Sequence, residues 1–263
     1  MISVIIPTYK PDYYIWECLD SIKDQSLDKF FFEVLIILNG DKEPYFAEIK
    51  NYIKRNKLFN FKLIYTEEKG VSNARNIGIE ISQGDYIAFI DDDDYISENY
   101  LLNFEKIKSE DSLCIASFTN FKKKYVILKE IKYKINDSTS SLNKYRKIFS
   151  YIGGKIISKK IIGNIKFDIR LKNGEDSLFM AAISKNIKYI KTSDQDTIYY
   201  RRIRENSASF KKKEKKYIIK NSYEQIKEYI FFYHNNQYDK IFIFIRIIAV
   251  IKGMFVNIFR RKI

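Results

Sequence analysis

The sequence predicts an α/β fold with a mixed, mostly parallel sheet flanked by helices and a helical extension at the carboxyl end. Strand-like apolar runs alternate with helical runs through the first ninety residues, which is typical of a parallel sheet. The longest of these strands is apolar at every position except Glu33, as in strands that are covered on both faces. A chain of 263 residues with 46% hydrophobic content is also long enough for one large α/β unit.

The elements of the first ninety residues follow one another in a regular order. Strands are expected at residues 3–6, 32–38, 61–65 and 86–90, and helices at 13–26, 45–56 and 72–82. Pro7 should end the first strand, because proline cannot extend a central ladder. Right-handed crossovers would make these strands parallel and bring the loops that follow them to one edge of the sheet.

Four adjacent aspartates, Asp91 to Asp94, follow the fourth strand directly. Adjacent carboxylates repel one another, so they need solvent, hydrogen-bond donors or a cation. Ligands bind at the carboxyl ends of strands in such folds, and a divalent cation is the partner that we expect for this cluster. The alternative for one or two of the four is a solvated turn, in which Asp94 or Ser97 caps a helix beginning near Glu98.

The predicted topology brings Tyr9, Asn39 and Arg75 to the same crevice as the aspartates. Arg75 lies in the first turn of its helix, where the amino end favours anions, and a guanidinium binds phosphate or stacks on a base. Together these groups suit a nucleotide diphosphate that carries a divalent metal. The alternatives are that Tyr9 covers the sheet edge and that Arg75 pairs with an aspartate.

The region beyond residue 110 is less regular. Strands are expected at residues 113–118, 125–133 and 197–200, a helix follows the polar link at 136–141, and another apolar helix spans 178–183. The last of these helices follows Glu175 and Asp176, which in isolation would be explained as acids that complement a helix amino end. Cys18 and Cys114 lie far apart in apolar segments, which argues against a disulfide framework.

Five motifs, in this order, resemble bacterial glycosyltransferase family 2. They are VIIPTY at residues 4–9, GVSNARNIG at 70–78, GDYIAFIDDD at 84–93, GEDSLF at 174–179 and YRRIRENS at 200–207. The resemblance covers about residues 1–210 and implies a Rossmann-like GT-A fold, a nucleotide-sugar donor and inversion at the anomeric carbon. It divides the chain into a donor-binding part (1–110), an acceptor-binding and catalytic part (111–210) and a basic amphipathic helical tail (211–263).

The same resemblance implies roles for individual residues. The base and ribose pocket would be lined by Pro7, Thr8 and Tyr9. Asp91 and Asp93 would be the two carboxylates of the Asp-x-Asp motif that hold Mn²⁺ or Mg²⁺, with Asp93 as the main ligand and Asp92 near the ribose or diphosphate.

Further roles concern the acceptor and the phosphates. Asp176 would be the general base, and Arg202 and Arg204 would contact the donor diphosphate. Where the family commonly has Asp-Asp-Gly-Ser, this chain has Leu-Asn-Gly-Asp at residues 38–41, so Asn39 would contact the base edge and the preference for uridine is left open.

The expected function is therefore an inverting, metal-dependent transfer from a UDP-sugar to a saccharide or lipid-linked saccharide of a surface polysaccharide, such as capsule, O-antigen or lipooligosaccharide. One rival, a sugar nucleotidyltransferase, should have a glycine-rich basic loop after its first strand, where this chain has PTYKP. Another, a non-enzymatic binder of polyanions or membranes, would leave the aspartates and Glu175-Asp176 without a role. No nucleic acid is expected as a partner.

The charge and the tail bear on location. The net charge of +14 indicates attraction to polyanions such as an anionic membrane surface. The first residues lack a basic segment of the kind that opens a signal peptide, so we expect a cytoplasmic protein, peripheral on the inner face of the membrane. Residues 238–263 are apolar but contain Arg246 and Lys252, which argues against a membrane span. An amphipathic helix on anionic lipid and packing onto the catalytic domain or a second subunit of a homodimer are both left open.

Overall fold

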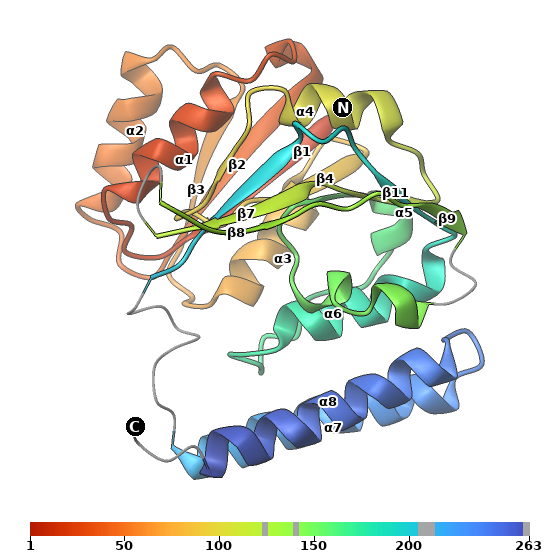
Figure 1. Ribbon diagram of the computed structural model, residues 1–263. Coiled ribbons are helices and arrows are strands. Elements are labelled where there is room, and N and C mark those ends of the chain that lie inside the picture. The colour runs from red at the N-terminus through yellow and green to blue at the C-terminus, as the bar shows by residue number, and fades with distance from the viewer. Residues whose placement is uncertain (123–125, 139–141, 205–213, 260–263) are drawn as a thin grey trace.

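The computed structural model describes residues 1–122, 126–138, 142–204 and 214–259. Its first part alternates strands and helices as the sequence predicts (Figure 1). The elements are β1 (Ile2–Thr8), α1 (Tyr14–Lys23), β2 (Phe32–Asn39), α2 (Tyr45–Arg55), β3 (Phe61–Thr66), α3 (Val71–Ile81) and β4 (Tyr86–Phe89), with a short 3₁₀ turn η1 (Lys29–Phe31). Each predicted strand and helix is present, with bounds shifted by a few residues.

The second part contains shorter strands and more loops. Its elements are β5 (Tyr95–Ile96), α4 (Tyr100–Ile107), β6 (Ser112–Ile115), β7 (Ser117–Phe121), β8 (Ile127–Ile131), β9 (Asn136–Ser138), η2 (Leu142–Tyr145), η3 (Ile148–Ser150), β10 (Lys155–Ser158), α5 (Lys159–Ile162), α6 (Glu175–Ile183), η4 (Ser184–Asn186), β11 (Tyr189–Thr192), β12 (Ile198–Arg202), α7 (Lys215–His234) and α8 (Lys240–Phe259).

Two sheets are formed by the described residues. The larger has the strand order β3-β2-β1-β4-β10-β6-β11-β9, and the smaller has the order β5-β12-β7-β8. The pairs β1–β2, β2–β3, β1–β4, β6–β11 and β7–β12 are parallel, whereas β10 runs antiparallel to both β4 and β6. The mixed, mostly parallel α/β class is thus confirmed, and the loops after β1, β2, β3 and β4 share one edge.

Pro7 does not end the first strand, contrary to the sequence prediction. In β1 the pairing with β2 continues through Pro7 to Thr8, whereas the pairing with β4 stops at Ile5. Proline is tolerated here because the neighbouring strand no longer requires its missing N–H.

Three expectations for the second part are also wrong. The strand predicted at 113–118 is two strands in different sheets, because the pairing of β6 with β10 and β11 ends at Ile115, and the Ser117 N–H donates instead to the Thr197 carbonyl beside β12 (2.9 Å). The helix expected after 136–141 is replaced by the 3₁₀ segments η2 and η3. The helix expected near Glu98 begins at Tyr100 without a side-chain cap, since Asp94 accepts a hydrogen bond from the Arg202 N–H and Ser97 one from the Ile198 N–H.

The central strands are buried on both faces. Along β1, Ile5 packs with α3 and α6 on one side of the sheet, whereas Val4 and Ile6 pack with α1 and α4 on the other. Burying each such side chain contributes roughly 1.5–3 kcal/mol relative to leaving it exposed. Gly78 lets α3 lie close to the sheet, because a Cβ there would be 2.4 Å from the Ile5 methyl Cγ2. This packing fixes the strand ends that carry the predicted site.

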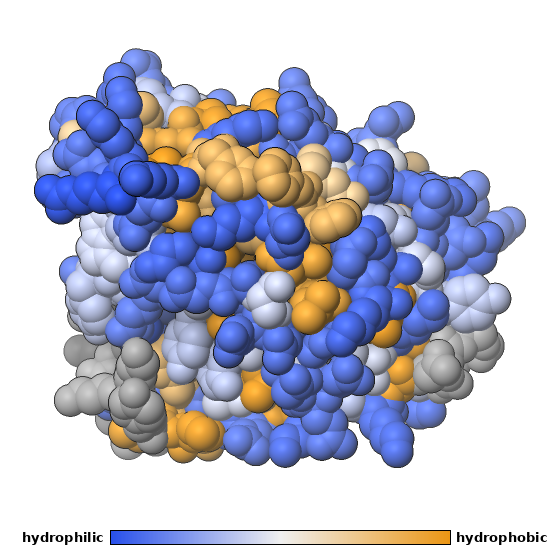
Figure 2. Space-filling view, turned by 90° about the horizontal axis from the view of Figure 1, so that it is seen from above, coloured by the Kyte–Doolittle hydropathy of each residue, from blue (hydrophilic) through white to orange (hydrophobic). Residues whose placement is uncertain are grey.

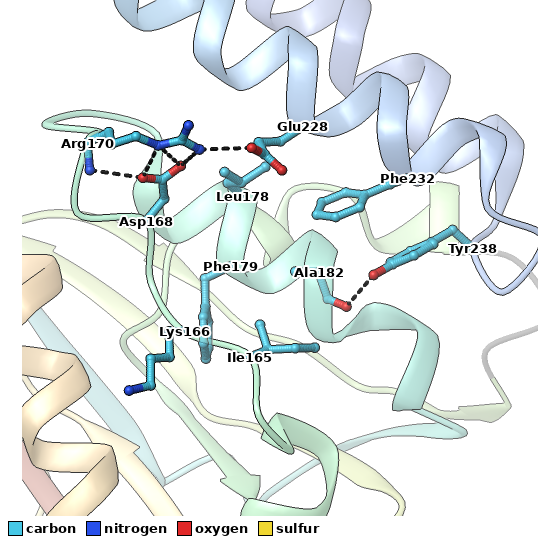
Figure 3. Close-up of a pocket in the computed structure, with 10 residues that line it drawn as sticks. All are labelled: Ile165, Lys166, Asp168, Arg170, Leu178, Phe179, Ala182, Glu228, Phe232 and Tyr238. Atoms are coloured by element: carbon cyan, nitrogen blue, oxygen red, sulfur yellow. Dashed lines mark hydrogen bonds and ion pairs between the residues drawn. The ribbon is translucent and has the colours of Figure 1, made fainter.

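The two last helices form a hairpin below the sheet, beside α6 (Figure 1). Tyr229 of α7 and Phe242 and Ile243 of α8 are fully buried and join the core cluster on the α3 side of the sheet. A cavity of about 260 Å³ is left between the hairpin and α6, lined by residues that include Leu178, Phe232 and Tyr238 (Figure 3). None of the predicted site residues lines this cavity.

Candidate active site

The ends of β1 and β2 meet the aspartate turn that follows β4. Thr8 donates a hydrogen bond from Oγ1 to the Asp92 carboxylate. Asn39 is buried, and its side chain donates to the Thr8 carbonyl (2.7 Å) and accepts from the Gly70 N–H (2.9 Å). The topology therefore brings these residues together as predicted. The Asn39 amide ties the loops after β1 and β3 to each other.

Arg75 links two of the predicted site carboxylates. Its guanidinium, only 3% exposed, donates to Asp176 (2.6 Å) and to Asp91 (2.9 Å). Its carbon Cζ also lies 5.2 Å from the centre of the Phe167 ring, so a cation–π contact covers one face. The alternative in which Arg75 pairs with an aspartate is thus the arrangement observed. It connects the aspartate turn with the start of α6.

Asp176 lies in the first turn of α6, after Gly174 in a left-handed conformation (φ 79°). One carboxylate oxygen pairs with Arg75, and the other accepts a hydrogen bond from the Ile152 N–H (3.1 Å). Burial raises the pKa of Asp176 above its ordinary value, and the Arg75 charge opposes that shift. The carboxylate is therefore oriented on both sides and made more basic than an exposed aspartate.

The neighbouring acid Glu175 has one carboxylate oxygen, Oε2, that is buried without a hydrogen-bond partner within the described structure. Its other oxygen lies 4.0 Å from Arg75. Burial, together with the nearby Asp176 charge, raises the pKa of Glu175 to about 7.

The aspartate turn concentrates negative charge. Burial and the neighbouring carboxylates raise the pKa of Asp92 to about 7 and that of Asp93 to about 6. Asp94 is buried, and the same causes raise its pKa well above the ordinary range. Asp91 is different, since its side chain is 43% exposed. The turn thus presents the Asp91 side chain to solvent and buries Asp94, whereas Asp92 and Asp93 are partly exposed.

Two arginines from the end of β12 and the segment after it contact this turn. Arg202 is buried, donates to the Asp93 carbonyl (2.9 Å) and pairs with Glu17 of α1. Arg204, 37% exposed, forms an ion pair with the Asp93 carboxylate (2.5 Å) and donates to the Tyr14 hydroxyl (2.9 Å). Arg202 therefore holds the turn in place, and Arg204 is the more accessible of the two. Residues 205–207 of the predicted motif lie outside the described residues.

The base-binding residues predicted from the first motif differ in exposure. Pro7 and Thr8 are buried in β1, whereas the Tyr9 ring is 45% exposed. The ammonium groups of Lys10 and Lys69 lie 5.8 Å and 5.7 Å from the centre of that ring, and both lysines pair with Asp41. An exposed aromatic ring beside two cations can take part in stacking on a nucleobase.

A divalent metal fits the aspartate turn if the substrate diphosphate supplies some of its ligands. No group of three or more His, Cys, Asp or Glu side chains among the described residues is arranged to hold a metal by itself. Mg²⁺ ions commonly bind through one or two carboxylates plus substrate phosphates and water. Asp91 and Asp93 provide two carboxylates, and burial together with the Asp91 charge raises the pKa of Asp93, an effect that a cation would offset. These residues therefore fit a metal that arrives with a diphosphate.

Several contacts in the site were not predicted from the sequence. Tyr199 accepts a hydrogen bond at its hydroxyl from the Asp91 N–H (3.2 Å). Lys155 is fully buried and donates to the Tyr151 and Gly153 carbonyls (2.7 and 3.0 Å), which shapes the loop whose Ile152 N–H binds Asp176. Tyr199 lies in the strand predicted at 197–200, so the sequence offered a residue for the contact with Asp91. A backbone N–H leaves no signal in a sequence.

Comparison with known proteins gives a consistent family. Glycosyl transferase family 2 matches residues 3–164. The minor teichoic acid biosynthesis protein GgaB of Bacillus subtilis is 30% identical over 79% of this chain, and the match covers 23% of that protein. The poly(ribitol-phosphate) beta-N-acetylglucosaminyltransferase TarS of Staphylococcus aureus is 29% identical over 77% of this chain and 36% of its own length. This chain thus spans less than two thirds of the length of these relatives.

Solved structures agree on the fold. The crystal structure of S. aureus TarS 1-349 superposes with a TM-score of 0.72 at 22% identity, covering 98% of this chain and 72% of that one. The mannosyltransferase PcManGT of Pyrobaculum calidifontis, in complex with GDP-Man and Mn²⁺, superposes with a TM-score of 0.62 at 13% identity, covering 96% and 69%. The fold is therefore the GT-A fold that the motifs predicted, and the chain belongs to glycosyl transferase family 2.

Proposed function

We propose that the protein is an inverting glycosyltransferase that moves a sugar from a nucleotide diphosphate to an acceptor hydroxyl. The observation that carries this proposal is the Arg75 bridge between Asp91 and Asp176. It sets the carboxylate of the proposed donor site and that of the proposed base on either side of one guanidinium. One of these carboxylates is assigned to the donor and the other to the acceptor, and both are held by the same guanidinium. Such an arrangement suits a reaction in which donor and acceptor meet between them.

Asp176 is the proposed general base. It accepts the proton of the acceptor hydroxyl while that oxygen forms a bond to the sugar C1 and the bond from C1 to the nucleotide diphosphate breaks. Attack opposite the leaving group inverts the anomeric carbon. The raised pKa of Asp176 makes it a stronger base than an exposed aspartate, and the Ile152 N–H and Arg75 hold it in one orientation.

The donor side is assigned to the exposed Tyr9 ring, to Arg204 and to the aspartate turn. Asp91 and Asp93 would hold Mn²⁺ or Mg²⁺. When bound there, the cation supplies positive charge beside the leaving diphosphate. Arg204 lies beside the same carboxylates and is accessible enough to contact a phosphate. Arg202 keeps the turn in position through its buried contacts.

The donor base and the acceptor are proposed from the relatives. TarS structures were solved with UDP and with UDP-GlcNAc, which supports a UDP-sugar as donor here. The names of TarS and GgaB concern poly(ribitol-phosphate) and minor teichoic acid, which supports a saccharide-containing polymer of the cell surface as acceptor. Capsule, O-antigen and lipooligosaccharide belong to the same broad class.

The experiment that tests the donor site is calorimetric binding of UDP, GDP, CDP and dTDP, with and without Mn²⁺. We expect one diphosphate to bind, more tightly with Mn²⁺, and Asp93→Asn to remove the metal-dependent part. Asp111→Asn is the matched control, because Asp111 pairs with Lys188 outside the site. If the folded protein bound no diphosphate under either condition, the proposed function would be wrong.

The base is tested separately with Asp176→Asn. This variant should still bind the diphosphate, whereas transfer from the matching nucleotide-sugar should fall by about 10²–10⁴, the usual contribution of general base catalysis. Turnover with a panel of UDP-sugars, followed by the release of UDP, measures this loss. Retention of most of the activity would contradict the assignment of Asp176.

A further inference from the structure

The side of the α7–α8 hairpin that faces away from the sheet carries a long apolar surface. Its exposed apolar side chains lie at helical spacing along both helices. We call this surface the outer face of the hairpin, and it comprises Ile219, Tyr223, Ile230 and Phe231 of α7 and Ile241, Phe244, Ile248, Phe255, Val256 and Phe259 of α8. Soluble proteins rarely expose so many large apolar side chains on one pair of helices, so this surface points to an interaction.

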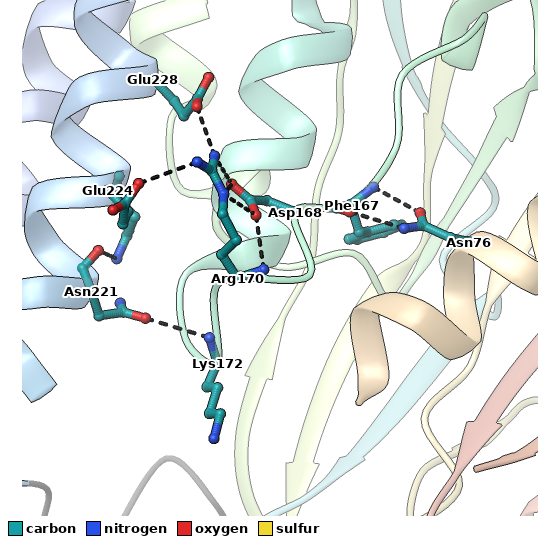
Figure 4. A network of polar contacts seen from close by, with 9 residues as sticks. Asn76, Phe167, Asp168, Arg170, Lys172, Asn221, Glu224 and Glu228 are labelled. Carbon is teal, nitrogen blue, oxygen red and sulfur yellow. Dashed lines mark hydrogen bonds and ion pairs between the residues drawn. The ribbon is translucent and has the colours of Figure 1, made fainter. Parts of the chain in front are cut away.

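The acidic side chains of the hairpin do not belong to that surface. Glu224 and Glu228 turn toward the domain, where both bind the guanidinium of Arg170 (3.3 and 2.8 Å; Figure 4). Asp239 accepts a hydrogen bond from the Phe242 N–H at the start of α8. These three are the acidic residues between positions 215 and 259. Glu224 and Glu228 thus carry their negative charge toward the domain, and Asp239 is engaged at the start of α8.

The basic side chains are arranged in the opposite way. Lys216, Lys220, Lys227 and Lys252 are exposed, and each lies at helical spacing with the apolar residues of the outer face. Arg246 is the exception, since it is buried and bonded to Ser150 (3.1 Å) and to the Phe149 carbonyl. The outer face is therefore apolar and positively charged, with Tyr223 and Tyr233 also exposed.

The side of the molecule opposite the hairpin can be compared by its hydropathy. Figure 2 views the molecule from above, the side away from the hairpin in Figure 1, and shows hydrophilic residues around a band of apolar ones.

We propose that the outer face of the hairpin docks on the surface of an anionic lipid bilayer. Apolar side chains of this kind insert at the boundary between headgroups and acyl chains, and lysines beside them bind anionic headgroups. Exposed tyrosines suit the same boundary, because their rings are apolar and their hydroxyls polar. The charge of the face is complementary to that of the proposed partner.

A second copy of the chain is a poorer match for this face. In a two-fold symmetric dimer the same patch would occupy both sides of the interface. Exposed lysines would then be placed near lysines, with the hairpin's acidic residues engaged elsewhere. Such contact places like charges together, whereas a lipid surface supplies the opposite charge.

Lying on a membrane also agrees better with the packing than crossing one. Among the described helices, α8 is long and apolar enough to span a bilayer by length and composition. However, Phe242 and Ile243 are fully buried against the domain, and Arg246 is bonded to η3. A spanning helix would have to give up these contacts, whereas a docked hairpin keeps them.

Docking would place the proposed base close to the membrane, a consequence that rests on the proposed function. Asn221 and Gln225 of α7 donate hydrogen bonds to the Asn173 carbonyl (3.0 and 3.2 Å), and the Tyr229 hydroxyl contacts Ser177 (3.0 Å). These contacts flank Asp176 in the chain. A lipid-linked acceptor could then reach the site without leaving the bilayer surface.

Co-sedimentation of the full chain with lipid vesicles tests the proposal. We expect binding to vesicles of equal parts phosphatidylglycerol and phosphatidylcholine, weaker binding in 0.5 M NaCl, and little binding to pure phosphatidylcholine. The double variant Phe244→Glu/Ile248→Glu should lower the affinity by roughly tenfold or more. Its matched control is Phe30→Glu/Phe59→Glu, which changes two exposed apolar residues outside the hairpin and alters the net charge equally.

Each outcome decides for or against the proposal. Binding that is lost in the hairpin variant and kept in the control supports it. Equal losses in both variants would show that net charge, rather than this face, drives binding. A concentration-dependent dimer without vesicle binding would assign the face to a second copy, and resistance of the bound protein to alkaline extraction would indicate a span. No substrate takes part, so the result is independent of the diphosphate-binding experiment.

Discussion

The surroundings of Asp92 disfavour the charged form of its carboxyl group. Its carboxylate accepts a hydrogen bond from Thr8 at the end of β1 and lies next to the charges of Asp93 and Asp91. These surroundings, burial first, raise the pKa of Asp92 to about 7. An unfolded chain would ionise the same group near 4. Between these values the folded protein holds a proton that the unfolded chain does not.

This difference predicts a pH dependence of stability. Because the folded state binds more protons than the unfolded state between about pH 4 and pH 7, the contribution of Asp92 to the free energy of unfolding falls as the pH rises. The slope for one group is at most about 1.4 kcal/mol per pH unit. Asp92→Asn should remove that slope and make the metal-free protein more stable than the wild type at pH 7.5. Urea unfolding from pH 5 to 8 measures it.

A matched control for this experiment is Asp168→Asn. The hydrogen bonds from Arg170 lower the pKa of Asp168 by more than burial raises it. The contribution of Asp168 to the free energy of unfolding is therefore lost as the pH falls, not as it rises. The two substitutions should therefore change the pH profile in opposite directions. Parallel profiles for wild type and Asp92→Asn would show that Asp92 is ionised in the folded protein at all these pH values.

The kinds of residue in the site could be predicted from the sequence, but their pairs could not. Asp91, Arg75 and Asp176 were each assigned to the site from motifs that lie far apart in the chain. That Arg75 binds both carboxylates depends on side-chain directions in α3 and α6, which no motif specifies. Asn39 shows the same limit, because its amide faces the Thr8 and Gly70 backbone.

At the scale of elements, the loop between η3 and β10 fixes the proposed base. Gly154 has a positive φ of 68°, and a Cβ there would lie 2.1 Å from Cζ of the Phe118 ring. Its carbonyl also accepts the Ala116 N–H at the break between β6 and β7. Two residues earlier, the Ile152 N–H binds Asp176. The glycine therefore allows a close approach that sets the position of this N–H.

Gly154→Ala should lower both stability and activity. The positive φ and the overlap with Phe118 together should cost about 2–4 kcal/mol of unfolding free energy. The loop must shift to relieve the overlap, so Asp176 loses its Ile152 partner and transfer slows while diphosphate binding persists. Gly163→Ala is the control, because Gly163 also has a positive φ (55°) but its Cβ would meet nothing within 4 Å. A Gly154 variant as active as the Gly163 variant would contradict this role of the loop.

The regular elements were predictable where the hydrophobic pattern was strong. The alternation from β1 to β4 follows from apolar runs bounded by turn residues, and the parallel order follows from crossover handedness. The later part was predicted less well. The run at 113–118 does not reveal that the chain passes from one sheet to the other after Ile115, since that change depends on the pairing of Ser117 with β12, which is distant in the chain.

For the whole molecule, residues 167–170 form one of the connections between the hairpin and the domain. Asn76 of α3 exchanges two hydrogen bonds with the Phe167 backbone (2.8 and 2.9 Å), and Arg170, three residues later, binds Glu224 and Glu228 of α7 (Figure 4). The sequence predicted a basic helical tail but left its partner open. The packing answers this for the inner side of α7, whereas the docking of the outer face stays a proposal.

Arg170 should therefore control how firmly the hairpin is held. Its guanidinium lies among Asp168 (2.6 Å), Glu228 (2.8 Å) and Glu224 (3.3 Å), so Arg170→Met leaves three carboxylates near one another without their cation. Arg170 is half exposed, and solvent screens these pairs, so we expect the free energy of local opening to fall by only about 1 kcal/mol. Amide hydrogen exchange along α7 should then become about fivefold faster, with little change in β1 and β2. Arg146→Met, an exposed arginine that donates to the Asn143 carbonyl, should leave α7 unchanged. Equal acceleration in the central strands would mean that the hairpin opens only when the whole protein unfolds.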